Sequence, residues 1–154
     1  MTLVELVGTL GLSDREVLAA TLWAEARSEA VVGRIAVGCV IRNRMIRRHQ
    51  TVKHVCLAKL QFSCWFPQGG EANHLRLRSL VENIATFRDP LWGECLWIAD
   101  GILSGACLDI TRGADHYLTT TLLASDKRPS WVEAMACAGV HGSHTFYRSE
   151  DRKV

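Results

Sequence analysis

The hydrophobic positions of this chain fall into a clear pattern from residue 13 onward. Ser13-Asp14-Arg15-Glu16 is a capping-box sequence, in which the serine hydroxyl and the glutamate carboxylate satisfy free backbone amides where a helix begins. The pattern predicts a helix over residues 13–28. Four residues at spacings of three and four share one stripe of this helix: Leu18, Leu22, Glu25 and Glu29. Two carboxylates therefore continue an otherwise apolar face.

Three further helices follow from the same periodicity. One covers residues 31–48, a second is indicated from Leu77 to Phe87 and stops at Pro90, and a third covers roughly residues 91–104. The inward positions predicted for residues 31–48 and 91–104 are Val32, Ala36, Cys39, Val40, Asn43 and Ile46, and then Trp92, Cys95, Leu96, Ala99, Ile102 and Leu103.

Loops and one short strand complete the expected fold. Residues 61–74 and 107–120 are rich in glycine and polar side chains, which is typical of loops, and His144 to Arg148 has the pattern of a strand. No repeat or linker-like stretch divides the chain. We therefore expect one mainly helical α+β catalytic domain over residues 1–154, with its core over about 13–148.

Composition places the chain among ordinary globular proteins. Of its 154 residues, 48% are hydrophobic and 22% are charged. The most apolar stretch, residues 91–108, is interrupted by Glu94 and Asp100, so we expect no stable insertion into a membrane. The first residues lack the basic start, apolar run and cleavage site of a secretory signal, which predicts synthesis in the cytoplasm.

The charges bear on possible partners. The formal net charge is only +2, but basic residues gather at Arg42, Arg44, Arg47, Arg48 and Lys53. Such a cluster is either the solvated face and end of a helix or a surface for an anionic polymer. No aromatic residues interleave with the arginines, which argues against nucleic acid as the partner.

The cysteines indicate no dedicated chemistry by their spacing. There are six, at positions 39, 56, 64, 95, 107 and 137, and no two form a Cys-x-x-Cys pair. Neither a zinc ribbon nor a thioredoxin-type site is therefore indicated. In the absence of a secretory signal, reduced thiols are expected.

Glu25 is the leading candidate for chemistry. An apolar face disfavours the charged form of a carboxyl group, and a proton held near neutral pH is what a general acid needs to protonate a glycosidic oxygen. The alternative is a glutamate at the edge of the stripe that reaches water or pairs with Arg27 or Arg34. Glu29, one turn further on, is expected to orient or tune Glu25, or else to lie on the helix surface.

Two other arrangements compete with Glu25. His116, His141, His144 and Cys137 offer ligands for zinc, but their spacing matches neither the helical His-Glu-x-x-His pattern nor a ribbon. Ser-Cys-Trp around Cys64 is similar to the nucleophile segment of papain-like proteases, where a helix N-terminus activates the thiol. Here the glycines and proline of residues 67–70 follow directly, which argues against a helix that begins at Cys64.

A set of motifs spans residues 18 to 148 and carries a family resemblance. The motifs are Ala24-Glu25-Ala26-Arg27 with Glu29, Gly33, Ala36-Val37, Asn43-Arg44, Gln61-Phe62-Ser63-Cys64-Trp65, Leu103-Ser104-Gly105, Asp109 with Thr111, Gly113-Ala114-Asp115-His116-Tyr117, Pro129 with Trp131, and His144-x-Phe146-Tyr147-Arg148. In this order and spacing they resemble the SleB-type cell-wall hydrolases, which include spore-cortex-lytic enzymes and phage lysins. Ser28, Ala30 and Arg112 depart from the family's usual Gly and Pro, which bears on loop shape rather than on the acid.

The resemblance implies a lysozyme-like, lytic-transglycosylase-like fold that cuts the MurNAc–GlcNAc backbone of peptidoglycan. The family's catalytic acid falls on Glu25. Substrate-binding roles fall on Gln61, Ser63, Trp65, Thr111, His116, Tyr117, His144 and Tyr147. Trp65 and Tyr117 would stack on sugar faces, with packing inside the domain as the alternative for both.

The predicted function is therefore a peptidoglycan-degrading enzyme, a lytic transglycosylase or a muramidase, that acts as a monomer without cofactor or metal. Its expected context is that of a phage-type endolysin released to the wall, for instance through a holin. The rivals are a wall amidase or peptidase that uses Cys64 or zinc, and a non-enzymatic glycan-binding protein. A hydrolase would need a second carboxylate across the bond from Glu25, from Glu29 or from the loop that holds Asp109 and Asp115.

Overall fold

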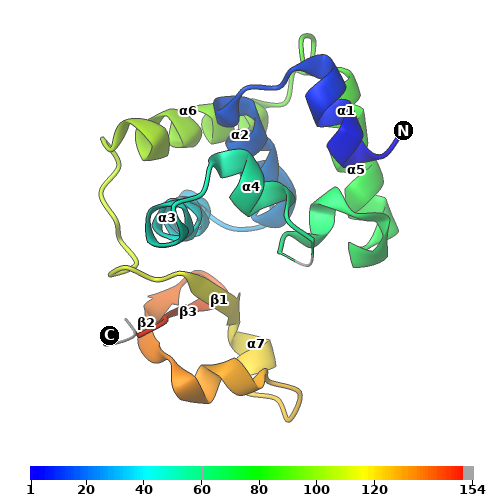
Figure 1. Cartoon of the computed structure of the whole chain (residues 1–154). Coiled ribbons are helices and arrows are strands. Elements are labelled where there is room, and N and C mark those ends of the chain that lie inside the picture. The colour runs from blue at the N-terminus through cyan, green and yellow to red at the C-terminus, as the bar shows by residue number, and fades with distance from the viewer. Residues whose placement is uncertain (60, 151–154) are drawn as a thin grey trace.

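The computed structural model describes residues 1–59 and 61–150, in which helices surround a central helix and a small sheet lies to one side (Figure 1). The helical part consists of α1 (Leu3–Leu10), α2 (Asp14–Glu25), α3 (Val31–Arg48), α4 (Val52–Leu57), α5 (Glu71–Glu82) and α6 (Pro90–Ser104). Two short 3-10 helices, η1 (Ser63–Trp65) and η2 (Pro67–Gly69), lie between α4 and α5. None of the helices described is long and apolar enough to cross a membrane.

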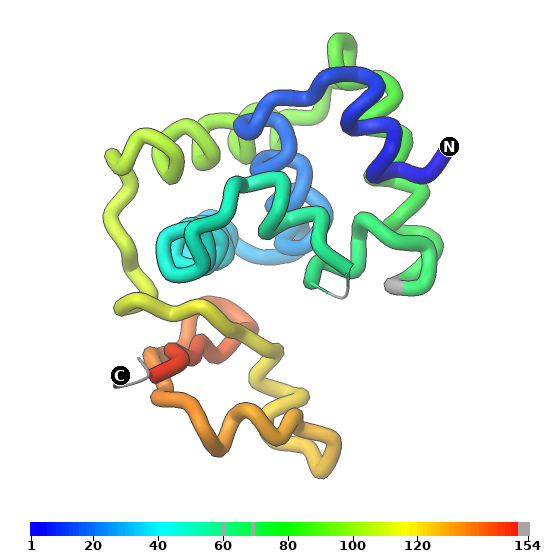
Figure 2. Tube along the Cα trace, in the orientation of Figure 1, coloured from blue at the N-terminus to red at the C-terminus, as the bar shows by residue number. Residues whose placement is uncertain are grey.

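The sheet part follows the long connection that leaves α6, which Figure 2 traces down to the first strand. Strands β1 (His116–Thr119), β2 (Ala136–His141) and β3 (His144–Arg148) form an antiparallel sheet in the order β1-β3-β2. Between β1 and β2 the chain forms α7 (Thr120–Leu123) and η3 (Ser130–Ala134). The expected mainly helical α+β fold is confirmed.

Helix α2 is the centre of the helical part. Every residue from Val17 to Ala24 is buried, because α3, α4, α5, α6 and η1 all contact this helix. A helix that is covered on all sides must be apolar all round, and the one polar residue in this stretch, Thr21, donates its hydroxyl to the carbonyl of Val17 at 2.8 Å. The predicted capping box at Ser13 and Glu16 begins the helix as expected.

The end of α2 differs from the prediction. The helix stops at Glu25 rather than near residue 28, so Glu29 lies in the loop before α3 and not one helical turn beyond Glu25. The buried guanidinium of Arg34 explains the early stop, because it donates to the backbone carbonyls of Ala26 and Glu29. These carbonyls are thus satisfied without a further turn of helix.

The bounds of the other predicted elements agree with the structure to different degrees. The helix over residues 31–48 and the strand over residues 144–148 are confirmed, and α6 begins one residue before the predicted range. Helix α5 begins at Glu71 and ends at Glu82, earlier at both ends than expected. Three positions predicted to face inward are exposed. Each lies in the first or last turn of its helix, where fewer neighbouring elements cover the side chain: Val32, Ile46 and Leu103.

Both faces of the sheet are covered. Successive side chains of β3 therefore pack alternately into two small hydrophobic clusters, one on each face. Phe146 packs with Ala36 and Val40 of α3, whereas Tyr147 packs with Leu118 and Val132 on the opposite face. Neighbouring residues of a strand point to opposite faces. The sheet therefore has one face toward the helical part and one face toward η3.

Asp109 and Asp115 hold the connection between α6 and β1. The carboxylate of Asp109 accepts hydrogen bonds from Thr111, Gly113 and Asn43, at 2.6–3.0 Å. Asp115 is buried, and its carboxylate contacts Nδ1 of His116 at 3.0 Å and accepts from the backbone N–H and hydroxyl of Ser149. Both carboxylates therefore have structural partners of their own.

The acid sensitivity of the fold should depend on Asp115. Burial by itself raises the pKa of this carboxyl group, but the hydrogen bonds from His116 and Ser149 outweigh it and hold the pKa well below its usual value. A lowered folded-state pKa contributes stability that is present above about pH 4, the pKa of an unfolded Asp, and is lost as the pH falls below it.

We expect Asp115→Asn to lower stability at neutral pH by about 2 kcal/mol, since hydrogen bonds to a charged group are replaced by weaker ones. Below pH 4 the difference between the two proteins should shrink. Urea unfolding between pH 2.5 and 7 measures this, and parallel stability curves for the two proteins would contradict the assignment.

Candidate functional site

Glu25 is the last residue of α2 and lies where the enclosed helix emerges toward the sheet. Its side chain is half-buried, and Oε1 accepts a hydrogen bond from the backbone N–H of Cys64 in η1 at 3.2 Å. The negative charge of Glu25 also reaches Tyr117 on β1: burial first, and then this charge, raise the pKa of the Tyr117 hydroxyl. Glu25 is thus bonded to the helical part, and its charge acts on the sheet.

Cys64 lies beside Glu25 but in the wrong state for a nucleophile. Its side chain is buried, and burial first, followed by the charge of Glu25 and a hydrogen bond with it, raise the pKa of the thiol far above its usual range. Nucleophilic cysteines need the reverse, a thiolate stabilised by positive surroundings. The segment around Cys64 is a three-residue 3-10 helix, without the helix N-terminus that activates the papain-type thiol.

The sheet face toward the helical part carries Tyr117 and His144. Tyr117 pairs with Phe146 in the register of β1 and β3, and its ring stacks on that of Phe146 with centroids 5.6 Å apart. The ring of His144 meets Tyr117 edge-on at 5.0 Å. These two predicted substrate-binding residues therefore share the sheet face that is turned toward the helical part, where the charge of Glu25 acts on Tyr117.

Glu29 approaches the same face from the loop after α2. Its carboxylate accepts a hydrogen bond from the hydroxyl of Ser143, and Oε1 lies 2.7 Å from Nδ1 of His144. That Nδ1–H is not aligned on the oxygen, so the contact is an electrostatic pair rather than a full hydrogen bond. The prediction of Glu29 on the same helix face as Glu25 is wrong, because the loop turns Glu29 toward the sheet.

Burial corrects the roles predicted for Trp65 and Thr111. Trp65 is 1% exposed, and its indole N–H donates to the hydroxyl of Thr21 on α2 at 3.0 Å. Its ring is packed in the core and presents no face for a sugar. Thr111 is fully buried, and its hydroxyl bonds Asp109 inside the connection to β1. Both residues support the site from within rather than line it.

The alternation of side chains along β1 and β3 argues against the substrate-binding roles predicted for His116 and Tyr147. In the β1–β3 register these two residues are paired, one position out of phase with Tyr117 and Phe146, so they point to the opposite face. There both rings pack against Trp131, with centroids 5.1 Å and 5.7 Å away. They therefore do not share a surface with Glu25.

Gln61 and Ser63 are exposed at the segment that leads into η1. Oε1 of Gln61 accepts from the buried guanidinium of Arg44 at 3.5 Å, which ties this segment to α3. Their exposure, next to Cys64, keeps both available for a ligand at Glu25.

His141 and His144 are paired across β2 and β3, but the histidines and Cys137 considered as zinc ligands do not form one cluster. His116 contacts Asp115, His141 packs on Phe146, and His144 faces Glu29. Within residues 1–59 and 61–150, no group of three His, Cys, Asp or Glu side chains is close enough to hold a metal ion.

Some contacts of the site were missed from the sequence. Ser143 and Gly142 form the turn between β2 and β3 against Glu29, and Gly142 has φ +59°. His74 of α5 is buried and its Nδ1 lies 3.0 Å from the carbonyl of Cys64, which supports η1 from behind. The turn sequence His-Gly-Ser-His is a hairpin signal that was available, whereas nothing marked His74.

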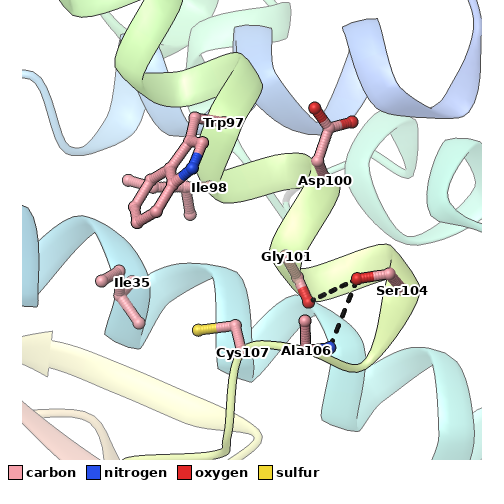
Figure 3. A pocket seen from close by; sticks show the side chains of 8 residues that line it. All are labelled: Ile35, Trp97, Ile98, Asp100, Gly101, Ser104, Ala106 and Cys107. Atoms are coloured by element: carbon pink, nitrogen blue, oxygen red, sulfur yellow. Dashed lines mark hydrogen bonds between the residues drawn. The ribbon is translucent and has the colours of Figure 1, made fainter.

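A pocket of about 530 Å³ lies elsewhere, between α3, α6 and the segment that follows α6 (Figure 3). Its lining includes Ile35, Ile98, Cys107 and the exposed ring of Trp97. It contains none of the predicted site residues, so we assign the candidate site to Glu25 and the sheet face opposite it.

Two solved structures of known proteins have the same mainly helical α+β fold as this chain. The catalytic domain of the germination-specific lytic transglycosylase SleB from Bacillus anthracis superposes with a TM-score of 0.62 at 20% identity, over 90% of this chain and 98% of that one. The catalytic domain of the Bacillus cereus SleB protein gives a TM-score of 0.56 at 20% identity, over 88% and 89% of the two chains. No curated protein matches the sequence significantly.

The sequence itself decides the family. A family model described as cell wall hydrolase matches residues 28–147, most of the chain. The chain belongs to this family of cell wall hydrolases, and its fold is that of the SleB catalytic domains.

Proposed function

We propose that this protein cleaves the MurNAc–GlcNAc backbone of peptidoglycan by lytic transglycosylation, with Glu25 as acid and then base. The observation that carries the proposal is the position of Glu25, at the end of an enclosed helix, bonded to the N–H of Cys64 and near enough to the sheet for its charge to act on Tyr117. Family membership supports peptidoglycan as the substrate, and the B. anthracis protein that shares this fold is a lytic transglycosylase.

The first step is protonation of the glycosidic oxygen by the Glu25 carboxyl group, which breaks the bond to the leaving sugar. The resulting carboxylate is stabilised by the N–H of Cys64. It then takes the proton of the MurNAc C6 hydroxyl, whose oxygen attacks its own anomeric carbon. Such an intramolecular attack needs no positioned water and benefits from a high effective concentration.

The surroundings of the other carboxylates favour this route over hydrolysis. Hydrolysis uses a second carboxylate as nucleophile or water activator on the other side of the bond. Asp109 and Asp115 are bonded within the connection to β1, and Glu29 is bonded to Ser143 beside His144. Each carboxylate that the sequence suggested as the second catalytic group is thus bonded to a structural partner.

Release of the protein as an endolysin stays a prediction.

Replacing Glu25 by Gln keeps the side chain's shape and removes its proton. We expect a folded protein whose lytic activity falls on the order of a hundredfold or more. Turbidity loss of purified cell walls measures this, with Trp97→Ala as the control, since that exposed ring lies in the remote pocket. Substantial lysis by a folded Glu25→Gln protein would exclude Glu25 as the acid.

The products distinguish the reaction. Transglycosylation leaves 1,6-anhydro-MurNAc ends, which are one water lighter than the ends that hydrolysis leaves. Mass spectrometry of digested peptidoglycan should show the anhydro product. Reducing MurNAc ends alone would establish a muramidase, and freed peptides without glycan cleavage would favour the amidase or peptidase rival.

Cys64 should be dispensable for the chemistry. Cys64→Ser keeps a donor beside Glu25, and we expect this variant to retain measurable lysis. Since no cluster of metal ligands occurs among the described residues, EDTA should leave the wild-type protein active. Complete inactivity of a folded Cys64→Ser protein, or inhibition by EDTA that zinc reverses, would favour a thiol or zinc hydrolase instead.

A further inference from the structure

The carboxylate of Glu29 lies in a socket between the helical part and the β2–β3 turn. Its side chain is 9% exposed and that of His144, on the sheet, 12%. Oε1 of Glu29 contacts both Ser143 and His144, and Oε2 lies against Gly142. A buried carboxylate that bridges two parts of a fold needs such polar partners to offset its lost hydration.

Two glycines make room for this side chain. A Cβ atom at Gly142 would lie 2.9 Å from Oε2 of Glu29, and one at Gly33 would lie 3.0 Å from the Cβ of Glu29. Gly142 also has a positive φ, which side chains other than glycine rarely adopt. The β2–β3 turn can therefore approach the Glu29 carboxylate this closely only because positions 33 and 142 are glycines.

The loop that presents Glu29 is itself anchored. Arg34 donates to the backbone carbonyl of Glu29 and pairs with Glu94 of α6 at 2.8 Å. The side chain of Arg34 is 9% exposed and that of Glu94 is 32% exposed, so this ion pair lies at the edge of the core. Glu29 is thus fixed from the helical side before it meets the sheet.

The effect of Glu29 on His144 is chemical as well as mechanical. A carboxylate oxygen 2.7 Å from Nδ1 favours the imidazole form that has its proton on Nδ1. Nε2 is then the free ring nitrogen, and it has no hydrogen-bond partner among the described residues. The His144 ring lies edge-on to Tyr117, whose hydroxyl is near the charge of Glu25.

We propose that Glu29 is a positioning residue that acts through His144 and not through Glu25: it anchors the turn at Gly142–Ser143 and sets the Nδ1–H form of His144, so that Nε2 is presented to the glycan. The glycan as ligand rests on the proposed function. The anchoring and the imidazole form do not, and the imidazole form is tested in the absence of substrate.

The first test is the ¹⁵N NMR spectrum of histidine-labelled full-length protein, because ring-nitrogen shifts distinguish protonated from unprotonated nitrogens. His144→Gln identifies the signals by their loss. At a pH high enough to make the ring neutral, the wild-type protein should show His144 with its proton on Nδ1. Glu29→Met, of similar length but without an acceptor, should lose this preference, whereas Glu29→Gln, which keeps an oxygen, should retain part of it. Glu82→Met, which replaces an exposed carboxylate of α5, is the control.

A wild-type His144 protonated on Nε2, or an unchanged His144 spectrum in both Glu29 variants, would overturn the proposal. If Glu29→Met does not fold, the wild-type and Glu29→Gln spectra still decide. These spectra are independent of lysis, so a protein that fails to degrade peptidoglycan would refute the proposed function and leave this result standing.

The second test is kinetic coupling. Glu29→Met should lower kcat/KM for peptidoglycan about tenfold, but in a His144→Gln background the further loss should be under about twofold, since both changes remove one unit. Fully additive losses would contradict action through His144.

The turn is tested separately. Gly142→Ala should lower activity, because the added Cβ would meet the carboxylate of Glu29. Gly11→Ala is the matched control: its φ is similar and nothing lies within 4 Å, so it introduces backbone strain alone and should retain activity.

Discussion

The site depends on the complete enclosure of α2. Because helices cover it on every side, the helix cannot shift or rotate, and its last residue, Glu25, emerges at a fixed place. The enclosure also fixes the partner of Glu25. The hydroxyl of Thr21 is held by the carbonyl of Val17 and accepts from the indole of Trp65, so the neighbour of Trp65, Cys64, is placed with its N–H on Glu25. A core hydrogen bond thereby positions a catalytic candidate.

The sheet imposes the second constraint. Strand β3 lies between β1 and β2 with both faces covered, so a shift of one residue would exchange the two sets of side chains between faces. In the observed register Tyr117 and His144 face the helical part, whereas His116 and Tyr147 face Trp131. Adjacent residues of one motif thus have different roles, and the resemblance of the motif alone does not separate them.

The sequence predicted what is local. The capping box at Ser13 and the helix over residues 31–48 depend on neighbours within a few turns, and both are confirmed. Helix α4 and strands β1 and β2 were missed, because short elements are stabilised mainly by distant contacts. Helix α1 was missed although its capping box, Thr2 with Glu5, is local and visible in the sequence. The end of α2 was predicted too late for a similar reason: Arg34 takes up the loop carbonyls, and no local pattern announces that contact.

For the site, the sequence identified Glu25 but not the partners that distinguish it from the other carboxylates. Asp115 accepts hydrogen bonds from groups on β1 and after β3, and these lower its pKa despite burial. Asp109 closes its own loop, and Glu29 reaches another part of the fold. Each is a carboxylate whose negative charge the fold uses, and protonating it would weaken a structural contact. Glu25 instead sits between a backbone N–H and the thiol of Cys64, at the edge of the core. Among the described contacts, fewer hydrogen bonds end on the Glu25 carboxylate than on that of Asp109 or Asp115, which suits a group that serves first as acid and then as base.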